Sequence, residues 1–143
     1  MKVSVKKRLV ATAVSTSERL VVTLSPPPKE LHPNVKAHWA VKARAVKAYR
    51  REAGYAALAE MRSVGLRGPW CGAVLEPHFF YDVLRRRDLD NLAASLKAAR
   101  DGLQDACLVV NDSDIKNLDP VVVVDRTEVP RVELWLVESS PAA

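Results

Sequence analysis

Short runs of β-branched residues mark the strands that the sequence predicts. Residues 19–24 (RLVVTL) form one such run, which ends at three consecutive prolines because proline cannot donate to a strand ladder. Residues 73–84 (AVLEPHFFYDVL) form a second run, in which Pro77 predicts an edge strand or a bulge. The valine-rich runs at residues 121–124 and 132–137 predict a hairpin.

A long helix is predicted over residues 35–64, which are rich in alanine, lysine, arginine, glutamate and leucine. Two glycines and a proline within residues 65–69 end this helix and begin a turn. We expect its buried side to include Trp39, Val46, Tyr49 and Leu58.

Residues 89–106 have the clearest helical periodicity in the chain. One face of this predicted helix is apolar, and its members are Leu92, Leu96, Ala99 and Leu103. The opposite face forms a stripe of Asp90, Ala94, Lys97 and Asp101. Asp88 precedes the first turn, where a carboxylate accepts backbone N–H groups and meets the positive end of the helix dipole, so we expect an N-cap there.

The predicted elements follow the order β, α, β, α, β, β. This order indicates an α+β fold: a small single domain with a mixed four-stranded sheet and two main helices packed on it. We expect the domain to span residues 19–138. Residues 1–18 are interpreted as an extension that is loosely ordered or adds an opening strand, and residues 139–143 as a disordered tail.

Composition narrows the class of protein. A chain of 143 residues with 48% hydrophobic and 27% charged residues is expected to fold as one globular domain rather than stay disordered. No apolar run approaches the roughly twenty residues of a membrane span, so no membrane association is expected. Cys71 and Cys107 are too few for a disulfide framework and lack metal-ligand spacing, which predicts two buried thiols in a reducing cytoplasm.

The net charge of +5 favours a polyanionic partner. The cations concentrate in the predicted long helix and in the run before Asp88, and we expect phosphate contacts from Lys36, Lys42, Arg44, Lys47, Arg85, Arg86 and Arg87. Such contacts position a nucleic acid by its backbone and carry no base sequence information.

Carboxylates gather around the second predicted helix. Asp88 and Asp90 flank the junction between strand and helix, and Asp112 follows in the turn after the helix. Magnesium usually takes a few carboxylates and completes its shell with water and substrate phosphate oxygens. These three aspartates therefore predict a metal site, and Lys97 is placed to offset charge that develops at a scissile phosphate.

Each of these features also has a simpler interpretation. One carboxylate of an isolated Asp-x-Asp pair is commonly a helix cap and the other a solvated surface charge. Lys97 and Asp101 have the spacing of an ordinary i, i+4 ion pair, and Arg85–Arg87 can be a solvated basic run. His32, His38 and His78 show no metal-ligand spacing.

The conjunction of these motifs resembles the RusA family of Holliday-junction resolvases, many of which are encoded by phages and prophages. The resemblance rests on three stretches, which are RRDLDNL from Arg86, LK at Leu96 followed by DGL from Asp101, and NDS from Asn111. It implies a homodimeric endonuclease of the bacterial cytoplasm that binds four-way DNA junctions. Such an enzyme nicks symmetrically related strands with magnesium or manganese.

The resemblance also implies roles for individual residues. Asp88, Asp90 and Asp112 are expected to be catalytic metal ligands and Lys97 the catalytic lysine. Asn111 stands where the family usually has the first aspartate of a pair, so the expected metal shell is one charge poorer or Asp114 compensates. The spacing from Asp90 to Lys97 exceeds that of shorter family members by nearly one turn. A non-catalytic module that binds branched DNA and a metal-dependent ribonuclease are the alternative functions.

Overall fold

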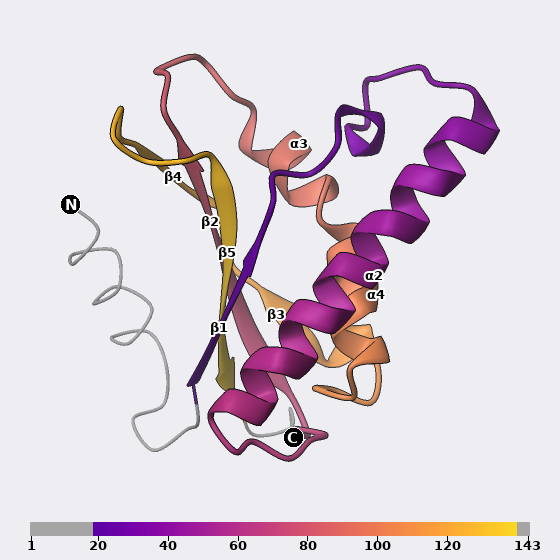
Figure 1. The fold of residues 1–143 in the computed structure, drawn as a ribbon, viewed down its shortest axis with the longest axis vertical. Helices are drawn as coiled ribbons and strands as arrows, with labels where there is room; N and C mark the ends of the chain where they lie inside the picture. Colours follow the sequence, from indigo (N-terminus) through magenta and orange to yellow (C-terminus); the bar gives the residue numbers. More distant parts are fainter. Residues whose placement is uncertain (1–18, 140–143) are drawn as a thin grey trace.

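A mixed five-stranded sheet forms one layer of the protein, and helices cover one of its faces (Figure 1). The structure, a computed structural model, describes residues 19–139. The predicted α+β class, with two main helices on a mixed sheet, is confirmed. The N-terminal extension and residues 140–143 of the predicted tail lie outside the described residues. Ser139 donates a hydrogen bond from its N–H to the carbonyl oxygen of Gly72 at 2.9 Å.

The sheet has the order β1, β5, β2, after which β3 and β4 both pair with the far edge of β2. Its strands are β1 (Arg19–Leu24), β2 (Ala73–Tyr81), β3 (Ile115–Asn117), β4 (Val121–Val124) and β5 (Arg131–Glu138). The prediction of four strands was one too few. The additional strand, β3, has three residues, which is too short for a hydrophobic alternation to reveal it.

The predicted hairpin of the last two strands was wrong. β4 pairs with β2 in the parallel direction, whereas β5 pairs with β1 and β2 in the antiparallel direction. β4 and β5 therefore lie on opposite sides of β2. β2 is buried at nearly every position, and strands on both sides pair its two edges. A β4–β5 hairpin on one side would leave the other edge of β2 unpaired.

Pro77 does not mark an edge strand, contrary to the prediction. It lies within the central strand β2 and is aligned with Leu134 of β5. On the other side of β2, pairing with β3 ends at Leu75 and pairing with β4 begins at His78. The carbonyl oxygen of Leu75 accepts from Leu118 on that side, and alternate residues of a strand point the same way. The missing N–H of Pro77 therefore faces the gap between β3 and β4.

Helix α2 (Trp39–Ser63) begins later than predicted and buries a different set of residues. His38 caps it, with Nδ1 accepting from the N–H of Ala40 at 3.2 Å. Tyr49 is buried as expected, but Trp39 and Val46 are exposed. The buried side is otherwise made of small residues and one methionine, which are Ala53, Ala57 and Met61. Figure 1 shows the reason, because the first turns of α2 lean away from the sheet.

The second predicted helix is two helices, α3 (Leu89–Ala94) and α4 (Lys97–Asp105). The break lies at Ser95, whose hydroxyl donates to the carbonyl oxygen of Leu92 at 2.7 Å. A serine hydroxyl that bonds to nearby backbone in this way competes with regular helical hydrogen bonds. The predicted apolar face is confirmed, since all four of its residues are buried.

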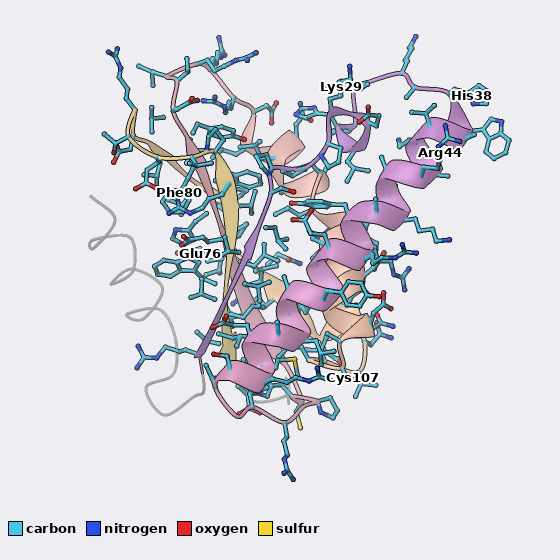
Figure 2. The ribbon with its side chains drawn as sticks, viewed as in Figure 1. Lys29, His38, Arg44, Glu76, Phe80 and Cys107 are labelled. Carbon is cyan, nitrogen blue, oxygen red and sulfur yellow. The ribbon has the colours of Figure 1, made fainter. Side chains whose placement is uncertain are left out.

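The two faces of the sheet differ in what covers them. The helical face packs into the main core with α2 and α4. On the opposite face, where Figure 2 labels Glu76 and Phe80, the ring of His78 stacks on Trp135 at a centroid distance of 4.2 Å. His78 Nε2 lies 2.9 Å from Glu76 Oε1 in a buried polar pair.

Two smaller findings complete the fold. Both cysteines are exposed, not buried as predicted. Cys107 follows the end of α4 with φ of 62°, a turn conformation, and Cys71 lies just before β2. Among the described residues, no helix combines the length and the apolar character that crossing a membrane requires.

Candidate functional site

Asp88 and Asp90 lie at the start of α3, after the arginine-rich loop. Asp88 is the N-cap that the sequence predicts, because its Oδ1 accepts from the N–H of Asp90 at 2.9 Å and of Asn91 at 3.2 Å. Its backbone is extended while the next residues are helical, as a cap requires. Asp90 is exposed in the first turn, where its negative charge suits the helix dipole.

Lys97 lies between two carboxylates that come from different elements. Its Nζ donates to Asp101 Oδ1 at 2.8 Å, one turn further along α4. It also donates to Asp112 Oδ2 at 2.5 Å, in the 3-10 helix η2 (Asp112–Asp114). The Lys97 side chain is 60% exposed, and both carboxylates are about one quarter exposed. The ammonium is therefore held in place at the surface and accessible to solvent.

These contacts favour the charged forms of Lys97 and Asp112. Hydrogen bonds to Asp101 and then to Asp112 raise the pKa of Lys97 above its ordinary value. The hydrogen bond from Lys97 lowers the pKa of Asp112 below its ordinary value. Lys97, Asp101 and Asp112 carry one positive and two negative charges, and the guanidinium of Arg100 interacts with both acids, so the four charges balance.

Two further residues fix the position of Asp112. Gln104 of α4 accepts the N–H of Asp112 on its Oε1 at 3.0 Å. Asn111 caps η2, with its side-chain oxygen accepting from the N–H of Ser113 at 3.0 Å. The amide at position 111 thus has a structural role that an aspartate would also fill. Gln104 was not predicted, because no local pattern marks it. Asp101 was expected on the same stripe as Lys97 and as its i, i+4 partner, but not among the site residues.

The structure does not gather the three predicted metal ligands. Within residues 19–139, no group of three Asp, Glu, His or Cys side chains is arranged to hold a metal ion. The stripe that was expected to align Asp90 with Lys97 is interrupted, because the break at Ser95 separates α3 from α4. Asp112 instead pairs with Lys97. The oxygen donors have the right chemistry for magnesium, which needs only one or two carboxylates besides water and phosphate.

The arginine run divides into one structural and two exposed side chains. Arg87 stacks on the ring of Tyr81, with its guanidinium carbon 3.5 Å from the ring centroid. It also donates to the carbonyl oxygens of Val83 and Arg85 at 3.2 and 3.1 Å. Arg85 and Arg86 are exposed, and the side chain of neither makes a hydrogen bond or ion pair in the described part of the chain. Arg85 and Arg86 are therefore the members of the run that remain available to an external anion.

The predicted basic residues Lys36, Lys42, Arg44 and Lys47 are all exposed, and Arg44 points outward from α2 in Figure 2. Lys42 borders a surface hollow of about 280 Å³ that also contains Lys97 and Asp101. The structure thus places a cation of α2 beside the Lys97 cluster, although the two are far apart in sequence.

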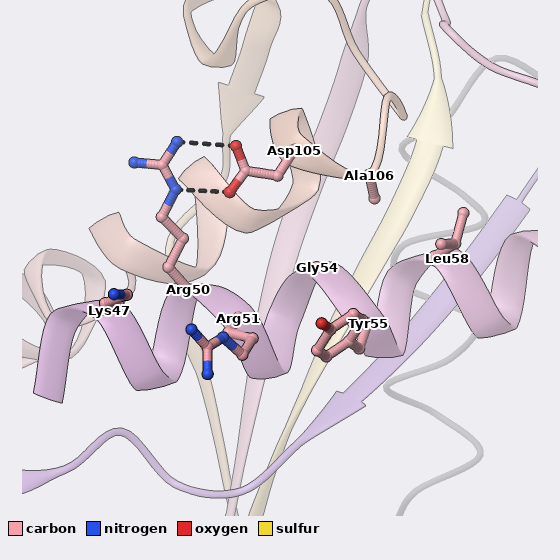
Figure 3. A pocket seen from close by; sticks show the side chains of 8 residues that line it. All are labelled: Lys47, Arg50, Arg51, Gly54, Tyr55, Leu58, Asp105 and Ala106. Carbon is pink, nitrogen blue, oxygen red and sulfur yellow. Dashed lines mark hydrogen bonds and ion pairs between the residues drawn. The ribbon is translucent and has the colours of Figure 1, made fainter. Parts of the chain in front are cut away.

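A separate hollow of about 340 Å³ lies further along α2 (Figure 3). Arg50 there forms a two-point ion pair with Asp105 of α4, at 2.6 and 2.8 Å. This hollow contains none of the predicted site residues except Lys47, and its carboxylate is already neutralised. We therefore place the candidate site at the Lys97 cluster.

Comparison with known proteins adds no family to these observations. No family model matches the chain, and no curated protein matches it.

Proposed function

We propose that this protein is a divalent-metal-dependent endodeoxyribonuclease that resolves four-way DNA junctions by paired, symmetric nicks in the cytoplasm. The observation that carries the proposal is the position of Lys97, an exposed ammonium held by two acidic residues at the edge of a hollow that a basic helix borders. The resemblance of residues 85–114 to the RusA family supports the choice of reaction.

The proposed roles follow from the chemistry of each side chain. Asp88 and Asp90 would hold Mg²⁺ or Mn²⁺, and Asp112, which pairs with Lys97 in the structure, would have to leave that pair to become the third ligand. When bound, the ion would supply an activated water as the nucleophile. Lys97 offsets the negative charge at the attacked phosphate, and the two acids that hold it keep its ammonium protonated across the neutral range.

Recognition is proposed to depend on the shape of the branch. The exposed cations of α2 and the loop residues Arg85 and Arg86 contact phosphates, which fixes the DNA without reading its bases. A four-way junction has pairs of strands related by two-fold symmetry. A homodimer with one site in each chain is therefore the simplest arrangement that makes two matched cuts.

Asp90→Asn tests the proposed metal site, because it removes a ligand charge and keeps the shape of an exposed side chain. We expect cleavage of a synthetic mobile junction in magnesium to fall by a factor on the order of a thousand, while junction binding persists. Asp119→Asn, which neutralises an aspartate in the loop after β3, is the matched control and should cleave normally. Normal cleavage by Asp90→Asn would remove this residue from the mechanism.

A non-catalytic module that binds branched DNA is the second candidate. The pairing of Asp112 with Lys97, and the absence of a gathered three-acid group within residues 19–139, favour it. Such a module would bind junctions equally well with magnesium or with a chelator and would produce no nicks under either condition. The same assay therefore separates the two candidates.

A further inference from the structure

Trp39 is an exposed indole at the first position of α2. Trp39 is 77% exposed, whereas Trp70 and Trp135 are only 2% and 4% exposed. The ring of His38 lies beside it, with centroids 5.7 Å apart and planes tilted by 31°. An aromatic ring of this size gains considerably from burial, so one left open to solvent at the start of a helix is suited to stack on a ligand.

The surroundings of Trp39 are apolar and cationic. A hollow of about 650 Å³ is lined by Trp39, Lys42, Ala43, Val46, Lys47 and Arg50. Residues 31–51 include no aspartate or glutamate. Arg50 is paired with Asp105, which leaves Lys42 and Lys47 to meet an external anion. The positive charge of this hollow is therefore complementary to a phosphodiester backbone. Its apolar wall is complementary to a planar ring such as a nucleobase.

The hollow at Trp39 adjoins the candidate site. Lys42 and Val46 line both this hollow and the one that contains Lys97 and Asp101. A strand with a phosphate at Lys97 can therefore pass over Lys42 and continue along α2 toward Trp39. Figure 2 labels His38 at this end of α2, with Arg44 further along the helix.

We propose that Trp39 is a stacking platform for an unpaired nucleobase of a DNA strand whose phosphates lie against Lys42 and Lys47. This inference rests on the proposed function, because it takes DNA as the substrate. It adds that this face of the protein recognises an unpaired base. Stacking on an aromatic ring tolerates any base, since every base has a flat π surface. The platform therefore favours branched or single-stranded DNA, whose bases can leave the stack, over a continuous duplex.

Tryptophan emission and affinity test the platform together. Titration with a single-stranded oligothymidylate should quench the emission of the wild type, and the quenching should disappear in Trp39→Phe, because the other tryptophans are buried. Trp39→Ala should bind the oligonucleotide about tenfold more weakly, and Trp39→Phe should recover most of the loss. Trp39→Leu, which keeps apolar bulk without a π surface, should not recover it. Affinity for an unbranched duplex should change little in all three variants.

Tyr55→Ala is the matched control, because Tyr55 is an aromatic residue on the same helix, is 69% exposed and lies outside this hollow. Its affinity for the oligonucleotide should equal that of the wild type. Equal affinities for wild type and Trp39→Ala would overturn the platform. A Trp39 emission that shifts with protein concentration in the absence of DNA would also overturn it, in favour of a contact between two copies of the chain.

The outcomes also separate this inference from the proposed function. Trp39-dependent binding without metal-dependent nicking would support the platform and contradict the nuclease. Nicking of junctions by an enzyme whose Trp39→Ala variant binds single strands normally would contradict the platform alone.

Discussion

At the scale of single residues, Lys97 is the centre of the candidate site. Its ammonium connects α4 to η2 through Asp101 and Asp112, and Gln104 holds the backbone of Asp112 from the same helix. A lysine with two carboxylate partners has a smaller range of positions than a solvated one. That restriction is what a charge-stabilising group requires, because its benefit depends on being in place before the reaction.

The pH dependence of stability should report the pairing of Asp112 with Lys97. Because the pKa of Asp112 is lowered in the folded state, its contribution to stability is complete well above 3.8 and is lost as the pH falls below that value. Urea unfolding between pH 6 and pH 2 should therefore show a shallower acid loss for Asp112→Asn than for the wild type. Asp119→Asn should follow the wild-type curve, and an identical curve for Asp112→Asn would indicate that the ion pair is absent in solution.

Residues with local partners were predictable from the sequence, and those with distant partners were not. The cap at Asp88 and the pair of Lys97 with Asp101 depend on spacings of two to four residues, which a sequence displays directly. The contact of Lys97 with Asp112 joins α4 to η2, so it depends on how the chain folds between them and cannot be read from a local spacing. Trp39 was expected to be buried because it is apolar, yet it lies where the helix has left the sheet.

At the scale of elements, the crossing of α2 and α4 determines where the site residues lie. The two helices come so close that Gly102 of α4 faces the backbone of α2. A Cβ at position 102 would lie 2.9 Å from the Cβ of Ala53 and closer still to the carbonyl oxygen of Arg50. The ion pair of Arg50 with Asp105 lies at the same crossing. α4 thus carries Lys97 and Gln104 at a fixed distance from the basic helix.

Gly102→Ala should destabilise the fold by about 1–3 kcal/mol, because the added methyl group would overlap with backbone that cannot yield locally. Gly54→Ala is the matched control on the opposing helix, where the nearest atom to an added Cβ is 3.4 Å away. Alanine also has a higher helix propensity than glycine by about 1 kcal/mol, so this control should be neutral or stabilising. Urea unfolding of both variants measures the difference. Equal stabilities would show that the helices separate at no cost.

The elements themselves were largely predictable, and their partners were less so. Periodicity identified the buried leucines of α3 and α4, because that pattern depends on the core alone. It could not identify the break at Ser95, where side chains bond to the carbonyl oxygens at the end of α3. The strands β4 and β5 were assigned to each other because they are adjacent in sequence. In the structure they instead pair with opposite edges of β2, so that both edges of this buried strand are covered.

At the scale of the whole molecule, the distribution of charge matters more than its sum. The net charge is only +5, but residues 31–51 carry cations without any acidic residue. These residues include the start of α2, which leans away from the sheet and presents its exposed cations to solvent. A concentrated basic face of this kind attracts a polyanion far more strongly than the same charges spread evenly would.

The salt dependence of junction binding should distinguish the exposed Arg85 and Arg86 from Arg87, which is stacked on Tyr81. Removing one cation that touches a phosphate should make the slope of log affinity against log salt shallower by roughly 0.9. The double variant Arg85→Gln, Arg86→Gln should therefore reduce the slope by up to about two units. Arg87→Gln should change the slope less and lower the thermal stability instead, because its guanidinium is stacked on Tyr81 and bonded to the loop.

Arg67→Gln provides the control for this series, since Arg67 is exposed in the turn after α2, at the opposite end of that helix from Trp39. Its slope should match that of the wild type, because a cation outside the proposed path displaces no counterion from the bound DNA. If the double variant kept the full slope, Arg85 and Arg86 would not contact phosphate, and the basic face of α2 alone would have to account for binding. If Arg67→Gln lowered the slope as much as the double variant does, binding would depend on total charge rather than on a defined path.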